Sequence, residues 1–388
     1  MADTEHQREN AGSVEDSGSP SPEPSFFDKK DARSVFGKLL STNLAIMGGG
    51  MNDAATGVLI PYMQPTYQIN LLQVSFIYLV NFAGWVVASF ANIHVCSRLG
   101  TGGTLVMGAT IQCMGVAFQD SQANAFTVTV KNSHRWLGIL HAVYGVGTII
   151  APVIANTIAS RTPSWHLYYL TTLAFGIVSI VLLAFTFRKG LFRPNVQNAK
   201  DTAGSELRAT ISNRTVWIIN GFFFLYVGAE VASGGWLVQF LVSVRHGDPK
   251  KVGYVASGFW SGFTLGRVVL ADITHKFGER RMIFVYIALA IVLQLMFWLI
   301  PSIPVNAVTV CLLGKRRSSW QDSSSAHSTP LVCFTASLGQ AGSAAFPFMT
   351  GAIASKAGVQ VLQPIMVGLL VGIAIFWALM PRQGQIRL

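Results

Sequence analysis

Residues 167–187 read LYYLTTLAFGIVSIVLLAFTF, a run without a charged side chain, and Arg188 and Lys189 follow it directly. A helix needs about 20 mostly apolar residues to cross the hydrocarbon core of a bilayer. Basic residues just beyond such a run are typical of the membrane–water interface. The stretch therefore predicts a transmembrane helix and places this part of the chain in a bilayer.

The composition of the whole chain agrees with this. Of its 388 residues, 51% are hydrophobic and only 12% are charged, against roughly a quarter charged in ordinary globular domains. The net charge is +11, but the basic residues cluster at the ends of apolar runs, which favours membrane topology over nucleic-acid binding. We expect the lipid bilayer, and no nucleic acid, as a partner.

Nine other apolar stretches predict membrane-spanning helices, at residues 39–62, 73–94, 103–118, 136–158, 216–244, 252–273, 282–300, 331–354 and 361–380. Two pieces, 119–130 and 305–313, are each too short to cross alone. We interpret them as the truncated fourth and tenth spans of a twelve-span, all-α plan.

Basic residues set the orientation. With both termini in the cytoplasm, the inner loops and tails from residue 29 onward hold 21 lysines and arginines and the outer loops hold five, as the positive-inside rule predicts. We expect a multi-pass protein of the plasma membrane or an internal membrane. Its expected parts are a disordered tail (1–37), an N-terminal helical bundle (38–187), a cytoplasmic loop (188–214), a C-terminal helical bundle (215–381) and a cytoplasmic tail (382–388).

The two halves align on each other. At an offset of 178, residues 83–85 align with 261–263, and Arg98-Leu99-Gly100 aligns with Lys276-Phe277-Gly278; further on, 147–152 aligns with 342–347 at an offset of 195. In both halves we expect the basic-apolar-Gly turn to end a helix. Repeated bundles of this kind are how many transporters are built, with a solute site between them.

One segment, Gly266-Arg-Val-Val-Leu-Ala-Asp272-Ile-Thr-His-Lys-Phe-Gly278-Glu-Arg-Arg281, resembles a signature of the major facilitator superfamily. The resemblance implies a cytoplasmic latch between helices. Its members here are Arg98, Gly100, Gly266, Arg267, Asp272, Gly278, Arg280 and Arg281. The first half departs from the family, because Asn92 or His94 stands where the acidic residue would be.

Four further stretches (52–53, 136–145, 228–236 and 339–347) resemble the fungal branch related to fucose permeases, called bypass-of-stop-codon-like transporters. The resemblance covers about residues 39–382. It implies a monomeric secondary transporter working by alternating access, with a sugar-like solute as the branch's substrate. Two alternatives stay open: an exporter of hydrophobic metabolites or drugs, and a non-transporting, degenerate member.

The degenerate alternative rests on two short segments. Only 35 residues separate Gly100 from Trp136, whereas two spans and a turn need about 45. The tenth span stops near Leu313, where a hydrophilic run begins. Both segments look like pieces lost or replaced through splicing or gene modelling.

Three acids lie within spans away from the latch: Asp53, Asp120 and Glu230. An ionised carboxylate in hydrocarbon is costly, so such groups face the bundle interior and are functional candidates. A carboxyl group that loads a proton on one side and releases it on the other couples transport to a proton gradient. We expect the proton as coupling ion; the alternative for each acid is a structural hydrogen bond between helices.

Neutral polar residues complete the candidate pathway for the small-molecule solute. They are Asn52, Asn124, His141, Tyr144, Trp236, Gln239 and Gln340. Asp120 and Asn124 share one helix face, as do His141 and Tyr144, and Trp236 and Trp260 offer flat rings on which a sugar could stack. A Trp in a span is often an interface anchor, and an intramembrane Gln often bonds only a neighbouring helix.

No motif indicates an enzyme. Gly145-Val146-Gly147 lacks the third glycine of a dinucleotide loop, and Gly314-Lys315 lacks the remainder of a phosphate-binding loop. The four cysteines (Cys96, Cys113, Cys311 and Cys333) have no metal-binding spacing. We therefore expect no catalytic residue, no metal and no cofactor.

Overall fold

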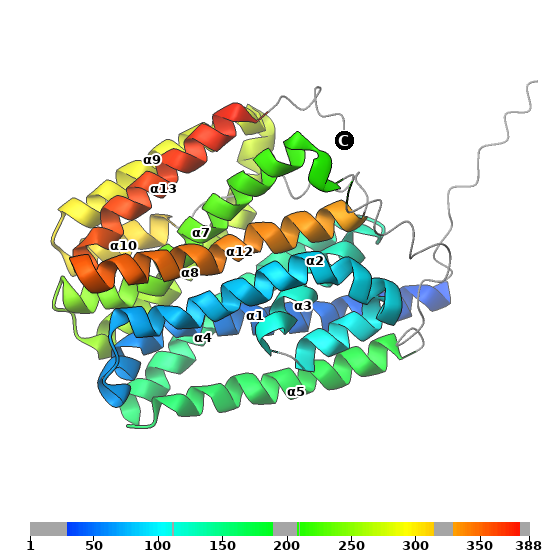
Figure 1. The fold of residues 1–388 in the computed structure, drawn as a ribbon, viewed down its shortest axis with the longest axis horizontal. Coiled ribbons are helices and arrows are strands. Elements are labelled where there is room, and N and C mark those ends of the chain that lie inside the picture. Colours follow the sequence, from blue (N-terminus) through cyan, green and yellow to red (C-terminus); the bar gives the residue numbers. More distant parts are fainter. Residues whose placement is uncertain (1–28, 111, 189–207, 209, 314–328, 381–388) are drawn as a thin grey trace, which may run out of the picture.

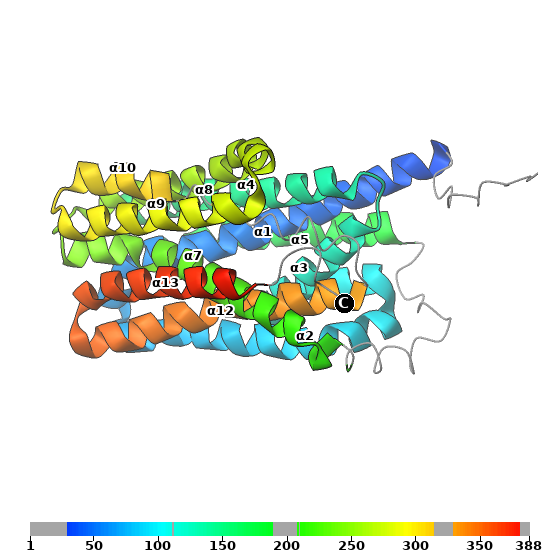
Figure 2. The same ribbon diagram turned by 90° about the horizontal axis from the view of Figure 1, so that it is seen from above.

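The structure is a computed structural model that describes residues 29–110, 112–188, 208, 210–313 and 329–380. Within these residues every regular element is a helix, which confirms the all-α prediction. The long helices run side by side along one axis (Figures 1 and 2). They are α1 (Lys29–Tyr67), α2 (Leu71–Thr110), α3 (Gln112–Val128), α4 (Ser133–Arg161), α5 (Tyr168–Phe187), α7 (Arg214–Ser243), α8 (Pro249–Phe277), α9 (Glu279–Leu299), α10 (Ile303–Leu313), α12 (Thr329–Ala357) and α13 (Leu362–Leu379).

Several elements recur at similar offsets in the two halves, although the first half has one helix, α3, where the second has two, α9 and α10. α2 and α8 begin 178 residues apart (71 and 249), and α4 and α12 begin 196 apart (133 and 329). The last helix of each half, α5 or α13, follows a short 3₁₀ turn, Trp165–Leu167 or Val359–Val361, and these turns begin 194 apart. These similar offsets support the predicted repeat. That the two halves also share one three-dimensional structure stays a prediction.

The region after residue 94 differs from the expectation. A span at 103–118 and a separate piece at 119–130 were expected, but α2 continues without a break to Thr110 and a single helix, α3, follows. Gly100 is therefore helical and ends no helix, so the expected turn in the first half was wrong. The chain is too short here for two spans, and it uses the available residues to lengthen α2 and form one returning helix.

The corresponding turn in the second half is present. α8 ends at Phe277, and Gly278 has a φ of 86°, a conformation that residues with a side chain rarely adopt. At the N-terminus, α1 begins at Lys29, inside the segment expected to be a disordered tail. Lysine, arginine and alanine in 29–38 are good helix formers, so the helix extends beyond the apolar span.

Hydropathy and burial separate peripheral helices from central ones. In the described residues, six segments are long and apolar enough to cross a membrane: Leu71–Ala91, Arg135–Arg161, Trp165–Phe187, Arg214–Ser243, Arg280–Leu299 and Val359–Leu379. In the most apolar part of α5 only 17% of residues are buried, against 56% in α7. α5 exposes an apolar stripe that includes Leu170, Leu173, Ile177 and Val181, as a lipid-facing helix does.

Among the described residues, helices from the two halves meet at several places. α2 and α3 pack on α12, α4 packs on α8, and α1 packs on α7. Of these, α1, α8 and α12 fall outside the strongly apolar segments. Their small and polar residues suit a position inside the bundle, where small side chains let helices approach closely.

Candidate functional site

Glycines bring α1 and α4 into backbone contact. A Cβ atom on Gly50 would lie 2.3 Å from the carbonyl oxygen of Tyr144, and one on Gly147 would lie 2.3 Å from the carbonyl oxygen of Met47. Cβ atoms in proteins essentially never show such distances. Only glycine therefore permits this approach of the two helices.

The approach brings the side chain of Tyr144 to the first candidate acid. The Tyr144 hydroxyl donates a hydrogen bond to Oδ2 of Asp53 at 2.9 Å, and the side chain of Asn52 also hydrogen-bonds this carboxylate. All three side chains remain partly exposed, although the adjacent Ala54 is buried. The structure thus brings together Asn52, Asp53 and Tyr144, as residues of one polar group between α1 and α4.

The α3 pair predicted from sequence also forms. Nδ2 of Asn124 donates to the Asp120 backbone carbonyl at 2.9 Å and to its Oδ1 at 3.2 Å. α3 packs against both α1 and α4. His141 lies one turn before Tyr144 on α4 and is partly exposed, like Asp120. These residues lie on α3 and α4, two helices that pack on α1 in this part of the bundle.

The second candidate acid lies on α7. Glu230 is 8% exposed, and one turn later α7 meets α1, where a Cβ atom on Gly57 would lie 2.6 Å from the carbonyl oxygen of Gly235. α1 and α7 run in the same direction (Figures 1 and 2). Asp53 precedes Gly57 by four residues, as Glu230 precedes Gly234. The two acids therefore lie at the same depth in the bundle, about 6 Å along the axis from this contact.

Trp236 has a structural contact rather than an open face. Its ring is 2% exposed, and its Nε1 donates to the carbonyl oxygen of Pro347 at 3.0 Å. Gln239 is also buried, and its Nε2 donates to Oγ of Ser243 on the same helix at 2.9 Å. Gln340 is partly exposed on α12. In this conformation Trp236 cannot stack with a solute, and it anchors α7 to α12.

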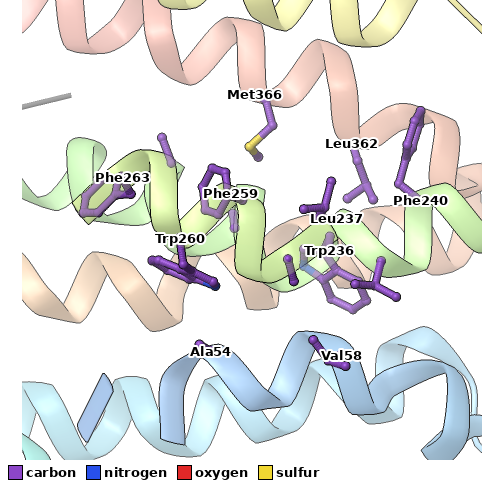
Figure 3. Packing of buried hydrophobic residues seen from close by; sticks show 14 of the residues in the cluster. Ala54, Val58, Trp236, Leu237, Phe240, Phe259, Trp260, Phe263, Leu362 and Met366 are labelled. Carbon is purple, nitrogen blue, oxygen red and sulfur yellow. The ribbon is translucent and has the colours of Figure 1, made fainter. Parts of the chain in front are cut away.

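Sequence reasoning missed Tyr78 on α2. Within the part of the chain that the structure describes, its hydroxyl is buried and has no hydrogen-bond partner, as is true of Nε1 of Trp260 on α8. Trp260 and Trp236 lie on the side of α8 and α7 that faces Ala54 and Val58 of α1 (Figure 3).

The cytoplasmic latch is described only in part. Arg280 and Arg281 are exposed at the start of α9, and Nη2 of Arg280 donates to the carbonyl oxygen of Ala378 at 3.4 Å. Arg98 is exposed on α2 and Gly266 is buried in α8. The side chains of Arg267 and Asp272 lie outside the described residues, so the latch pairing stays a prediction. No cluster of metal-binding residues occurs among those the structure describes.

An all-helical bundle with lipid-facing outer helices and polar groups held between its inner helices defines a multi-pass integral membrane protein. Residues 121–315 match the family model of the Major Facilitator Superfamily. The chain belongs to this superfamily. Membership of this superfamily indicates a transporter rather than an enzyme.

Curated relatives and solved structures agree with this assignment. The chain is 25% identical over 276 residues to Bypass of stop codon protein 6 of Saccharomyces cerevisiae, a match that covers 59% of this chain and 55% of the relative. It is 21% identical over 410 residues to a glucose/galactose transporter of Brucella abortus, covering 89% of this chain and 95% of the relative. The chain thus spans about half the length of the yeast relative.

The fold resembles that of the Escherichia coli fucose:proton symporter FucP, with a TM-score of 0.62 and 15% sequence identity over 90% of this chain and 100% of that one. A bacterial homologue of the iron transporter ferroportin gives a TM-score of 0.63 at 13% identity, covering 90% of this chain and 99% of that one. At these identities the likeness concerns the fold alone.

Proposed function

We propose that the protein moves a small, sugar-like polar solute across a membrane by alternating access, coupled to the movement of protons. The two halves rock about their contacts, so that a site between them opens to one side and then to the other. Both termini lie in the cytoplasm, and the protein works as a monomer. Asp53 and Glu230 carry the coupling proton, and the polar residues around them bind the solute.

The single observation that carries this proposal is the hydrogen bond from Tyr144 to Asp53. A carboxyl group at membrane depth is costly, and such groups are functional candidates by default. Here the carboxyl group lies between two helices that glycines hold in backbone contact, and it remains partly exposed. A partly exposed acid inside a bundle is accessible to a proton and to the hydroxyl groups of a solute.

The names of two similar proteins favour a sugar. The Brucella abortus relative is a glucose/galactose transporter that matches along 89% of this chain, and the structurally similar FucP is a fucose:proton symporter. Hydroxyl-bearing solutes also suit the candidate groups, because carboxylates accept hydrogen bonds while asparagine, glutamine and tyrosine side chains both donate and accept them.

Uptake into cells or vesicles tests the proposal. Labelled D-glucose, D-galactose and L-fucose are supplied to vesicles that contain the protein, with an imposed proton gradient or with a protonophore. We expect one sugar to accumulate only with the gradient, and Asp53→Asn to remove this accumulation. Efflux of a drug or a fatty acid that is not inhibited by added sugars would instead support the exporter alternative.

A second candidate function is that of a non-transporting member. The structure has one helix, α3, where two spans are expected, and α10 is only 11 residues long. A helix of that length covers about half of the hydrocarbon core. Retention of the tagged chain in internal membranes, together with absence of uptake, would support this candidate.

A further inference from the structure

Two hydrogen-bond donors lie buried and unpaired where α2 and α8 approach α7. The Tyr78 side chain is 5% exposed and that of Trp260 is 1% exposed, and neither the hydroxyl of Tyr78 nor Nε1 of Trp260 has a hydrogen-bond partner among the residues that the structure describes. Buried polar groups in folded proteins nearly always have a partner, and each exception needs an explanation. Both donors are also in the same small region of the bundle.

Consecutive glycines of α7 hold the two side chains. The Tyr78 hydroxyl lies 2.8 Å from the position of a Cβ atom on Gly235, and Cζ2 of Trp260 lies 2.8 Å from that of a Cβ atom on Gly234. A larger residue at either position would displace these rings. The glycines therefore keep room for the side chains that carry the donors.

The same two glycines form the contact between the halves. Gly57 of α1 lies against the backbone of Gly234 and Gly235, and Ala54 and Val58 face the tryptophans from α1 (Figure 3). In this conformation α1 covers the region, so a movement of α1 away from α7 opens it next to the candidate acid.

We propose that the Tyr78 hydroxyl and the Trp260 indole N–H are the specificity-determining donors for the solute, and that they bind acceptor oxygens of a sugar when α1 separates from Gly235. This inference rests on the proposed function and names its recognition groups. The indole N–H donates only, and the tyrosine hydroxyl donates or accepts. Together with the carboxylate of Asp53, they would present both donors and an acceptor to a hydroxyl-bearing solute.

Thermal unfolding of the purified full chain without solute tests whether the donors are unpaired. Tyr78→Phe removes a hydroxyl that makes no bond, so we expect an unchanged or higher Tm. The matched control is Tyr168→Phe, because the Tyr168 hydroxyl donates to the carbonyl oxygen of Met51 at 2.9 Å and its loss should lower the Tm. An equal loss of Tm in both variants would overturn the inference.

Equilibrium binding of D-glucose, D-galactose and L-fucose to the same proteins tests the use of the donors. We expect Tyr78→Phe and Trp260→Phe each to raise the Kd about tenfold or more, as for one lost hydrogen bond to a bound solute. Tyr168→Phe should leave the Kd unchanged. Deoxy sugars identify the sugar oxygen that accepts the hydrogen bond. A sugar that lacks this oxygen should bind to wild type and to the variant that lacks the donor with the same Kd.

The outcomes separate the two proposals. If wild type binds a sugar and Tyr78→Phe binds it with the same Kd, the donors have no role in recognition and this inference fails alone. If wild type binds none of the sugars, the sugar-like substrate of the proposed function is wrong, and the assignment of these donors to a sugar is wrong with it.

Discussion

Asp53 and Glu230 are the two acids that the account depends on, and they differ in their surroundings. Asp53 is partly exposed and accepts a hydrogen bond from Tyr144, whereas Glu230 is 8% exposed within α7. They lie at the same depth on two helices of different halves. In the proposed mechanism, one acid faces the solute while the other exchanges a proton.

We expect Glu230→Gln to abolish proton-driven uptake while leaving solute exchange partly intact. The amide keeps the shape of the side chain but cannot bind and release a proton, so we expect only the coupled step to be lost. The measurement compares gradient-driven uptake with counterflow in vesicles. Equal loss of both activities would argue against a coupling role for Glu230.

We expect Tyr144→Phe to lower uptake about tenfold through its effect on Asp53, whose carboxylate it contacts at 2.9 Å. If the two residues act as a unit, the double variant Tyr144→Phe with Asp53→Asn should be no worse than Asp53→Asn alone, because residues in contact are non-additive. The uptake rates of the two single variants and of the double variant, each compared with wild type, give the coupling energy between Tyr144 and Asp53. Strictly additive losses would contradict a shared role.

Glycines determine how closely α1 and α4 pack. A Cβ atom on Gly147 would lie 2.3 Å from the Met47 carbonyl oxygen, while one on Gly138, on the same helix, would meet nothing within 4 Å. We expect Gly147→Ala to cost about 1–3 kcal/mol through overpacking. Gly138→Ala, the control, should gain up to about 1 kcal/mol from helix propensity.

Thermal unfolding of the two purified variants checks this prediction. A lower Tm for Gly147→Ala, with an unchanged or higher Tm for Gly138→Ala, supports backbone contact between α1 and α4. Similar Tm values for the two variants would mean that α1 and α4 do not pack this closely, and the Tyr144–Asp53 bond would lose its basis.

Hydropathy predicted most helices but not their contacts. α4, α5, α7, α9, α12 and α13 lie within a few residues of the expected spans, because long apolar runs dominate that signal. The path of residues 100–128 could not be predicted, since the chain has fewer residues there than the family plan requires. The candidate acids were identified because charge in a span is rare, whereas Tyr78 was missed because an unpaired hydroxyl is visible only in three dimensions.

The halves are also joined near one end of the bundle, through Asn156 of α4. Its side chain is fully buried, with Nδ2 donating to the carbonyl oxygen of Lys250 at 2.8 Å and Oδ1 accepting from the Tyr62 hydroxyl at 3.4 Å. Lys250 belongs to α8, so this contact connects the halves. On the proposed topology it closes the outer side.

We expect Asn156→Ala to shift the population toward conformations open at this end, because the bond to Lys250 is lost. Spin labels are placed at the C-terminal end of α1 and at the N-terminal end of α8. The distances between these labels should be longer or more broadly distributed than in wild type. The control is Asn220→Ala, whose side chain bonds only to Val216 of its own helix at 2.8 Å. Identical distributions in wild type and Asn156→Ala would show that this contact does not hold the end closed.

Gradient-driven sugar uptake by purified protein in liposomes tests the central claim most directly. With an imposed proton gradient, the account predicts accumulation of D-glucose, D-galactose or L-fucose above equilibrium, collapse on addition of a protonophore, and no accumulation with Asp53→Asn. Uptake that ignores both the protonophore and this substitution, or no uptake of any of the three sugars by wild type, would contradict it.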